Sequence, residues 1–392
     1  MRVDYTDEQV LLREELQAYF TTVLTPEVRA ELRAEGHGGP VHREVRQKLG
    51  TDGWLGIGWP KEYGGQGRSV LDQYVFFDEA SRAGAPVPMI ALNTVGPTIM
   101  AAGTEEQKQR YLPGILAGTL DFAIGYTEPG SGTDLASLRT RAVLDGDHWV
   151  VNGNKVYTSG GDLADFIWLA ARTEPDAPKH KGISILLVPT AAEGFSATPI
   201  RTMGGGTTTA TYYTDVHVPV GNVVGEVNAG WKLITTQLNH ERVALSAMGG
   251  RCLGLSDAVR QWATETVTPE GTRVIDEPWV RTSLARVHAR LEAMKVMNWR
   301  MAYAVHTGTL TPAAASAAKV YGTEVEIEAY RLLLDVLGRA GSLRRGSPGA
   351  VLEGKVEQAY RDAPVRTFGG GSNEVQREII CWTALGTPRG GR

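Results

Sequence analysis

The chain has 392 residues, enough for roughly two or three packed units with a large apolar core. Its net charge of -4, with both signs interspersed, argues against a nucleic-acid partner. The cysteines, Cys252 and Cys381, are too few for a disulfide framework or a cysteine-rich metal site, and they suit a reducing cytoplasm.

The N-terminal residues are charged and amphipathic, and they lack the apolar stretch of a signal peptide. No part of the sequence approaches the roughly 18 uninterrupted apolar residues of a membrane-spanning helix. We therefore expect a cytoplasmic protein without a membrane span. Residues 6–120 follow a helical pattern, and Thr6 and Gln9 have the spacing of a capping box at its start.

The pattern changes after residue 120. Alternating apolar and polar residues, punctuated by Gly, Pro, Asn and Asp, predict an antiparallel sheet or a small barrel. A helical period then returns and continues to the end of the chain. The helices are expected at 231–265, 278–308, 312–340 and 349–362, and from Glu374. This order predicts an α+β protein with domains at 1–120, 121–228 and 229–392.

The most informative segment runs from Tyr126 to Gly161 and begins with a loop rich in Thr, Gly and Ser. Thr127, Ser131 and Thr133 supply hydroxyl groups, and the glycines between them allow a ligand to approach the backbone. Such a loop suits a diphosphate or the polar edge of a flavin. An ordinary turn between strands explains the loop alone equally well.

An aromatic residue followed by hydroxyl groups lies near the end of the same segment, as Tyr157, Thr158 and Ser159. The ring could stack on a flavin while a hydroxyl reaches the flavin edge. Taken alone, Tyr157 is better explained as a residue that packs across neighbouring strands.

Four motifs in this order resemble the acyl-CoA dehydrogenase family, and the resemblance covers almost the whole chain. They are WPKEYGGQG from Trp59, YTEPGSGTDLA from Tyr126, NGNKVYTSGG from Asn152 and FGGGSNEVQR from Phe368. The resemblance implies an N-terminal helical domain, a middle β-barrel-like domain and a C-terminal four-helix bundle, usually assembled as a tetramer. It also implies FAD-dependent oxidation of an acyl-CoA thioester to the trans-2-enoyl-CoA, with β-hydride transfer to flavin N5. The electrons then pass to an electron-transfer acceptor protein.

The resemblance also implies the residues of the site. Tyr157 takes the stacking position, where many members have Trp, and Ser159 takes the place of the Thr that hydrogen-bonds flavin N5. Thr133 and Arg242 are the implied substrate contacts, and no metal is implied. The implied cofactor contacts are Tyr126, Thr127, Gly132, Thr133, Tyr157, Ser159, Gly371 and Ser372.

The reaction needs a carboxylate that removes the α-proton. Many members carry it near the C-terminus, but alignment on Val375–Arg377 puts Gly370 at that position. Periodicity offers Glu241, which is the one charged member of an otherwise apolar helical stripe. Partial burial would raise the pKa of such a carboxyl group and strengthen it as a base. The stripe consists of Trp231, Ile234, Leu238, Glu241, Leu245, Met248 and Cys252.

An ion pair is the alternative explanation of Glu241. Pairing with Arg242, His240 or an arginine from another helix would make it a residue that only orders the core. The resemblance favours catalysis, because isovaleryl- and long-chain-type members carry the base on this helix in a Glu-Arg pair. The absence of a glutamate at position 370 and the presence of Glu241 are then explained together, by a base that has changed its place in the sequence.

Two elements that normally serve the FAD of a neighbouring subunit are altered. The Arg-x-x-Phe-Gly motif of homotetrameric members is replaced by TPEGTRVIDEPW at Thr268–Trp279, in which Arg273 is not in a clear register. Asp335 stands where the family has Gln in its Gln-x-x-Gly-Gly-x-Gly stretch. The pattern resembles the base-bearing chain of actinobacterial heterotetrameric dehydrogenases that act on CoA thioesters of sterol side chains.

That resemblance implies a related but distinct partner chain. A homotetramer that acts on branched or long acyl chains is the alternative. Two further functions stay open: an oxidase or nitroalkane-type enzyme that passes electrons to O2, and a non-catalytic subunit that only completes a partner's site.

Overall fold

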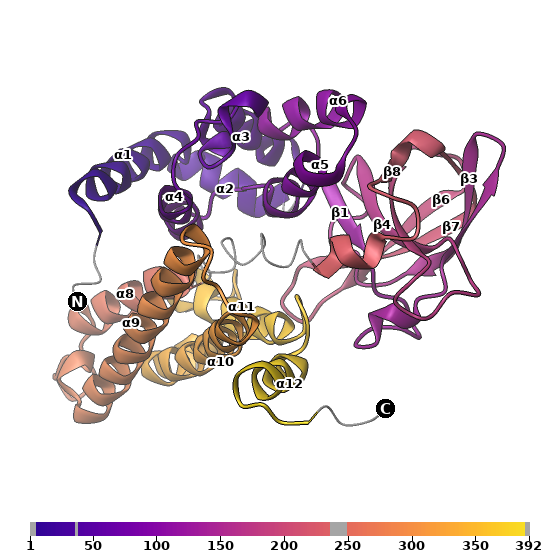
Figure 1. Ribbon diagram of the computed structural model, residues 1–392. Coiled ribbons are helices and arrows are strands. Elements are labelled where there is room, and N and C mark those ends of the chain that lie inside the picture. The colour runs from indigo at the N-terminus through magenta and orange to yellow at the C-terminus, as the bar shows by residue number, and fades with distance from the viewer. Residues whose placement is uncertain (1–4, 36–37, 236–248, 389–392) are drawn as a thin grey trace.

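The structure, a computed structural model, describes residues 5–35, 38–235 and 249–388. Helices, a sheet and a second set of helices follow one another along the chain (Figure 1), which confirms the predicted α+β order. No helix in these described ranges combines the length and the apolar character that a bilayer crossing requires.

The first set of helices carries clear start signals. The predicted capping box is present, since Gln9 N donates to Thr6 Oγ1 at 3.3 Å and Thr6 N donates to Gln9 Oε1 at 3.0 Å. Ser69 and Thr104 cap two later helices in the same way. The set comprises α1 (Asp7–Val23), α2 (Pro26–Glu35), α3 (Pro40–Thr51), α4 (Val70–Ala83), α5 (Gly96–Ala102) and α6 (Glu105–Leu116).

The middle set forms an eight-stranded sheet in the order β6-β7-β3-β2-β4-β5-β8, with β1 paired to β4. The sheet is mixed, because β1 and β2 run parallel to β4, whereas the alternating pattern predicted antiparallel pairing. The strands are β1 (Phe122–Gly125), β2 (Arg141–Asp145), β3 (His148–Lys155), β4 (Phe166–Arg172), β5 (Ile183–Pro189), β6 (Phe195–Arg201), β7 (Thr207–Pro219) and β8 (Val223–Val224).

Strand β4 joins the sheet to the first set of helices, because it is apolar on both faces. Trp168 and Ala170 belong to the core shared with those helices, whereas Ile167 and Leu169 belong to the core on the opposite face of the sheet. Alternate residues of a strand point to opposite faces, so one strand serves two cores. The loop that follows β1 is therefore anchored on a rigid support.

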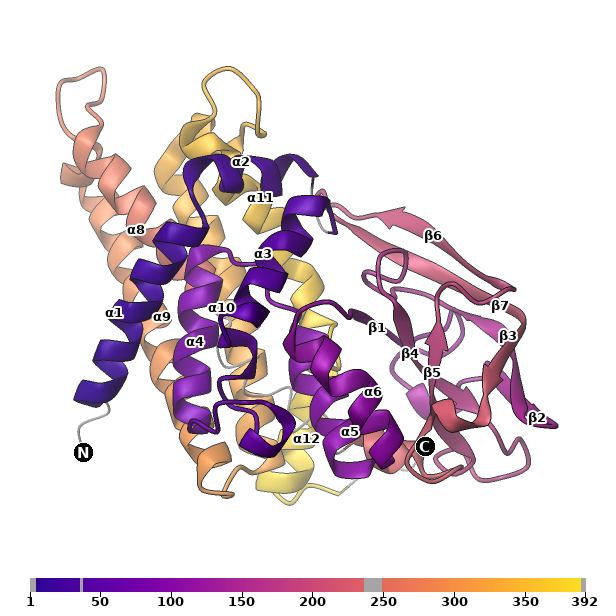
Figure 2. The same cartoon turned by 90° about the horizontal axis from the view of Figure 1, so that it is seen from above.

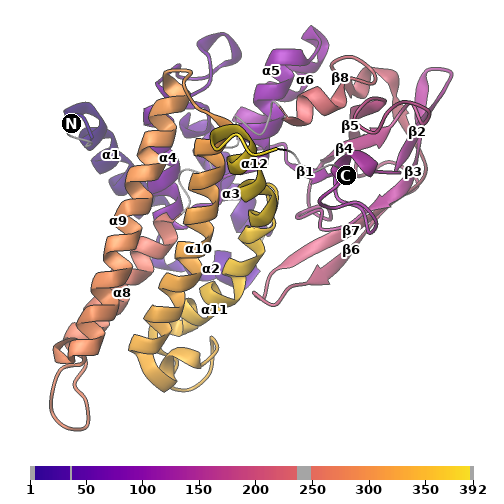
Figure 3. The same ribbon diagram turned by 60° about the horizontal axis from the view of Figure 1, so that its bottom comes forward.

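The last set of helices forms a bundle around α10, which packs against α8, α9, α11 and α12. Helix α4 joins the first set of helices to the bundle, because it packs against α1 and also against α8 and α9 (Figure 2). The loop between α8 and α9 projects from one end of the bundle (Figure 3). The elements are α8 (Gly250–Glu265), α9 (Pro278–His306), α10 (Pro312–Leu337), α11 (Lys355–Asp362) and α12 (Asn373–Ala384).

One predicted helix is shorter than expected. The helix predicted from residue 349 begins only at Lys355, after Leu352, Glu353 and Gly354 with φ values of 49°, 56° and 69°. Left-handed backbone cannot continue a right-handed helix. A Cβ at Gly354 would lie 2.6 Å from Arg345 N, so the close approach of two chain segments sets this boundary.

Candidate active site

The loop after β1 closes on itself and presents its tip to solvent. Glu128 N donates to Ser131 O at 3.0 Å, and Ser131 N donates to Glu128 O at 3.1 Å. Ser131 is buried and its hydroxyl donates to Asp134 O at 2.8 Å, so this hydroxyl serves the loop itself. Gly132 and Thr133 are exposed and remain available to a ligand.

A buried ion pair lies at the base of this loop. Lys155 Nζ, at the end of β3, is 2.8 Å from Glu128 Oε1, and the side chains are 0% and 8% exposed. The carboxylate also accepts hydrogen bonds from Arg139 N at 2.7 Å and Thr140 N at 2.8 Å. Burial raises the pKa of Glu128, but the Lys155 ammonium and these N–H groups outweigh it, so the pKa lies below its ordinary value. This geometry agrees with a structural role for Glu128.

The ring of Tyr157 is not packed against the neighbouring strands. Its side chain is 66% exposed and its backbone has a φ of 61°, which is rare for a residue other than glycine. The cross-strand packing explanation is therefore wrong. Strain of this kind is concentrated at ligand sites.

The two hydroxyls after Tyr157 have different surroundings. Thr158 is fully buried, and its Oγ1 lies 3.5 Å from Thr211 Oγ1 on β7. Ser159 is exposed, and its Oγ lies 3.1 Å from Thr208 Oγ1. A ligand beside the tyrosine ring can therefore meet the hydroxyl of Ser159, whereas Thr158 fixes the turn.

The structure brings the two halves of the segment together. Val156 N donates to Thr127 O at 2.8 Å, and Lys155 Nζ donates to Tyr126 O at 3.0 Å. Trp168 Nε1 donates to the Tyr126 hydroxyl at 3.0 Å. An exposed ring, exposed hydroxyls and an open glycine loop thus lie on adjoining stretches of backbone. This donor set fits the ring and diphosphate of a flavin nucleotide.

The remaining predicted contacts lie at the N-terminus of α12. Ser372 caps this helix by accepting a hydrogen bond from Val375 N at 3.4 Å, and Gly370 and Gly371 before it have φ values of 68° and 92°. Lys319 on α10 donates to Gly371 O at 2.8 Å and to Asn373 Oδ1 at 2.7 Å. Because left-handed backbone disfavours any residue with a Cβ, this loop conformation agrees with the absence of a glutamate at position 370.

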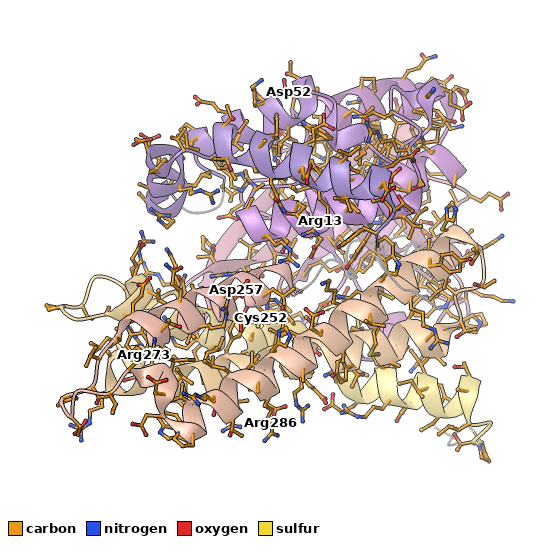
Figure 4. The ribbon with its side chains drawn as sticks, turned by 90° about the vertical axis from the view of Figure 1, so that its left-hand side faces the viewer. Arg13, Asp52, Cys252, Asp257, Arg273 and Arg286 are labelled. Atoms are coloured by element: carbon orange, nitrogen blue, oxygen red, sulfur yellow. The ribbon has the colours of Figure 1, made fainter. Side chains whose placement is uncertain are left out.

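The predicted base, Glu241, and the predicted substrate contact Arg242 lie outside the described residues. The ends of the predicted stripe can be placed: Ile234 is 3% exposed and Cys252 is fully buried. Burial raises the pKa of Cys252 well above its ordinary value. Figure 4 shows Cys252 within the bundle.

The altered loop between α8 and α9 is held by its own charges. Arg273 Nε lies 2.8 Å from Asp276 Oδ2, and Arg281 Nη2 lies 2.7 Å from Asp276 Oδ1. Figure 4 places Arg273 at the outer end of the bundle. Asp335, the other altered residue, is exposed at the end of α10. Its Oδ2 atom lies 3.7 Å from Arg331 Nη1.

Comparisons with known proteins agree with this geometry. Three family models match the chain: the acyl-CoA dehydrogenase N-terminal domain at residues 6–119, the middle domain at 123–216 and the C-terminal domain at 228–384. The acyl-CoA dehydrogenase FadE26 of Mycobacterium tuberculosis is 57% identical over 402 residues, which is 100% of both chains.

Two solved structures are similarly close, and each is 57% identical and covers 100% of both chains. One is the Tcur3481-Tcur3483 steroid ACAD, with a TM-score of 0.95. The other is the ChsE4-ChsE5 complex from Mycobacterium tuberculosis, with a TM-score of 0.94. The chain therefore belongs to the acyl-CoA dehydrogenase family, whose members are flavoprotein oxidoreductases that act on CH-CH groups.

Proposed function

We propose that this chain binds FAD and dehydrogenates an acyl-CoA thioester at its α and β carbons. The observation that carries the proposal is Tyr157, an exposed ring on strained backbone beside the exposed Ser159. Family membership gives the reaction class. Bound FAD would supply the acceptor for the hydride that leaves the β carbon.

Individual residues of the chain would have separate roles in the reaction. Tyr157 would stack on the flavin, and Ser159 would donate a hydrogen bond to its edge. Glu241 would remove the α-proton as the hydride leaves, and Thr133 and Arg242 would contact the substrate. The remaining contacts to the cofactor would come from Tyr126, Thr127, Gly132, Thr133, Gly371 and Ser372.

A related chain is the proposed partner, in a heterotetramer. The support is the loop around Arg273, because its charges are paired within the same chain. Asp276 forms ion pairs with both Arg273 and Arg281. The named complexes among the similar structures each combine two chains, Tcur3481 with Tcur3483 and ChsE4 with ChsE5. Assembly of the chain as a homotetramer would contradict this part of the proposal.

The proposed substrate is the CoA thioester of a sterol side chain, because one of the similar structures is described as a steroid ACAD. We place the reaction in the cytoplasm, with an electron-transferring flavoprotein as acceptor. The free state of Cys252 and Cys381 supports a reducing compartment.

The test is to express the chain alone and with candidate partner chains, and to measure flavin per chain and reduction by acyl-CoA. A panel of short, branched, long and steroid side-chain thioesters would be mixed anaerobically with each preparation. Bleaching of the flavin with slow reoxidation in air supports the dehydrogenase. Rapid peroxide formation would favour the oxidase, and full occupancy and turnover in the lone chain would exclude the need for a partner.

A further inference from the structure

The ion pair between Lys155 and Glu128 is the most completely buried ion pair at the candidate site. Its nitrogen and oxygen are 2.8 Å apart, and Lys155 has no exposed side-chain surface. A buried pair of this kind is weak evidence for stability, since an apolar pair of similar size is often neutral or stabilising. Its contacts point to another use.

The lysine fixes one peptide of the loop. Lys155 Nζ donates to Tyr126 O at 3.0 Å, and the described chain contains no cis peptide bond. In a trans peptide the C=O and N–H groups point in opposite directions. The Thr127 N–H group is therefore held pointing away from the buried ammonium.

The glutamate fixes the far end of the same loop. Its two oxygens accept hydrogen bonds from Arg139 N and Thr140 N, at 2.7 Å and 2.8 Å, where the chain enters β2. The backbone of Glu128 also closes the turn with Ser131. Glu128 thus closes the turn with its backbone and holds the exit of the loop with its carboxylate.

The pair also sets the position of the tyrosine ring. Lys155 is the last residue of β3, and Tyr157 follows it by two residues. Val156 N, between them, donates to Thr127 O at 2.8 Å. Any movement of Lys155 relative to Glu128 would change the spacing between the loop and the exposed ring.

A second cation, Arg172, holds the outer part of the loop. Arg172 on β4 donates from Nη2 to Ala136 O at 2.6 Å and from Nη1 to Lys181 O at 2.7 Å. The loop is therefore held at its start by Lys155, at its turn by Glu128 and beyond its tip by Arg172.

We infer that Lys155 and Glu128 are positioning residues that hold the loop of Tyr126 and Thr127 and the ring of Tyr157 at the separation a flavin requires. Both side chains are buried, so their effect on the flavin would be exerted through the loop and the ring. The inference rests on the proposed function, because it assigns a role toward the proposed cofactor. It predicts that flavin binding depends on the pair more strongly than folding does.

The test compares four variants in the assembly that binds FAD, with FAD itself as the probe. Lys155→Met and Glu128→Gln each break the pair and leave one charged or polar partner behind. The double variant Lys155→Met/Glu128→Gln removes both charges and keeps an amide oxygen that can accept from Arg139 N or Thr140 N, so no unpaired charge is buried and the chain should still fold. Glu79→Gln is the matched control, since Glu79 is 3% exposed and lies 2.8 Å from Arg13 between α1 and α4.

The readouts are the thermal midpoint, the FAD dissociation constant and the visible absorption spectrum of the bound flavin. We expect the double variant to fold with a lower thermal midpoint than wild type, because Tyr126 O and one loop N–H group lose their partners, but to unfold well above the temperature of the FAD titration. It should nevertheless bind FAD at least about tenfold more weakly, a change of about 1.4 kcal/mol. Its flavin spectrum should be shifted, whereas the control should keep the wild-type spectrum and affinity.

Two outcomes would separate the inference from the proposed function. A double variant that folds and binds FAD with wild-type affinity and spectrum would overturn the positioning role, while the proposed function would stand. A wild-type chain that binds no FAD in any assembly would overturn the proposed function and the inference with it. Partial rescue of the single Lys155 variant by Lys155→Arg, which keeps the charge and the donors, would support the positioning role.

Discussion

Arg273 is paired with Asp276 inside its own loop, at 2.8 Å, and the same carboxylate is shared with Arg281 at the start of α9. One antiparallel β-bridge between Val267 and Arg273 and a hydrogen bond from Thr268 N to Thr272 O at 2.7 Å close the loop further. The charge of this arginine is therefore paired within its own chain. The relationship bears directly on how the chain assembles.

We predict that Arg273→Ala leaves FAD content and turnover of the assembled enzyme within about twofold of wild type, the usual range for an exposed substitution. Arg273 is exposed and Asp276 is partly exposed, so the loss of their ion pair changes only the loop. Flavin absorbance per chain and kcat/KM with an acyl-CoA would measure this. Release of FAD from the variant complex would contradict it, because it would show that the arginine reaches a cofactor.

Replacing Glu241 tests the proposed base. Glu241→Gln keeps the size and polarity of the side chain but cannot accept the α-proton. We expect turnover to fall by at least about 100-fold, the lower end of general-base effects, while FAD stays bound. Glu265→Gln, at the exposed end of α8, is the control and should keep wild-type turnover. Unchanged activity in Glu241→Gln would instead support the non-catalytic subunit.

Local sequence signals predicted the start of the first helix because they depend on neighbouring residues. The capping box at Thr6 needs only four consecutive positions, whereas the role of the hydroxyl after Tyr157 stays a prediction that rests on its order in the chain. Ser131 was misjudged because its hydroxyl is satisfied by Asp134 O, a contact that depends on how the loop closes.

Long-range geometry was harder to predict. The parallel pairing of β1 with β4 joins segments more than forty residues apart, and alternation within a strand does not report on its direction. Lys155 did carry a signal, since it shares the inward phase of β3 with Trp149 and Val151. A lysine in the buried phase of a strand requires a buried partner, and Glu128 lies far away in the sequence.

Tyr157 should lower the stability of the flavin-free protein and strengthen FAD binding. We predict that Tyr157→Gly raises the free energy of unfolding of the flavin-free protein by about 0.5–1 kcal/mol, because relief of a left-handed backbone, about 1–2 kcal/mol, exceeds the entropic cost of glycine. FAD binding should weaken roughly two- to tenfold through loss of ring stacking. Chemical denaturation and flavin titration would measure the two effects.

The control for the ring is Tyr157→Phe, which keeps the aromatic face and the backbone strain. It should match wild type in both measurements, since the tyrosine side chain is largely exposed. A glycine variant that is less stable than wild type and binds FAD equally well would show that the ring serves packing after all.

The last prediction concerns the pH dependence of Lys155. Burial lowers the pKa of Lys155 to about 8 from its ordinary 10.5, against the opposing attraction of Glu128. Between these values the unfolded chain binds more protons than the native chain, so the free energy of unfolding that this group contributes rises with pH. Below the lower value both states hold the proton, and the contribution is constant.

Wild type should therefore gain stability relative to Lys155→Met above pH 8. The free energy of unfolding of wild type minus that of Lys155→Met should rise between about pH 8 and 10.5, by at most about 3 kcal/mol, because methionine does not titrate. FAD affinity of wild type should fall around pH 8, where Lys155 of the native chain loses the charge that holds Glu128. Lys155→Arg should show neither change, since a guanidinium group stays protonated there. Denaturant titrations at closely spaced pH values would measure this difference. A difference that stays flat or falls with pH would mean that the ammonium is not the titrating member of the pair.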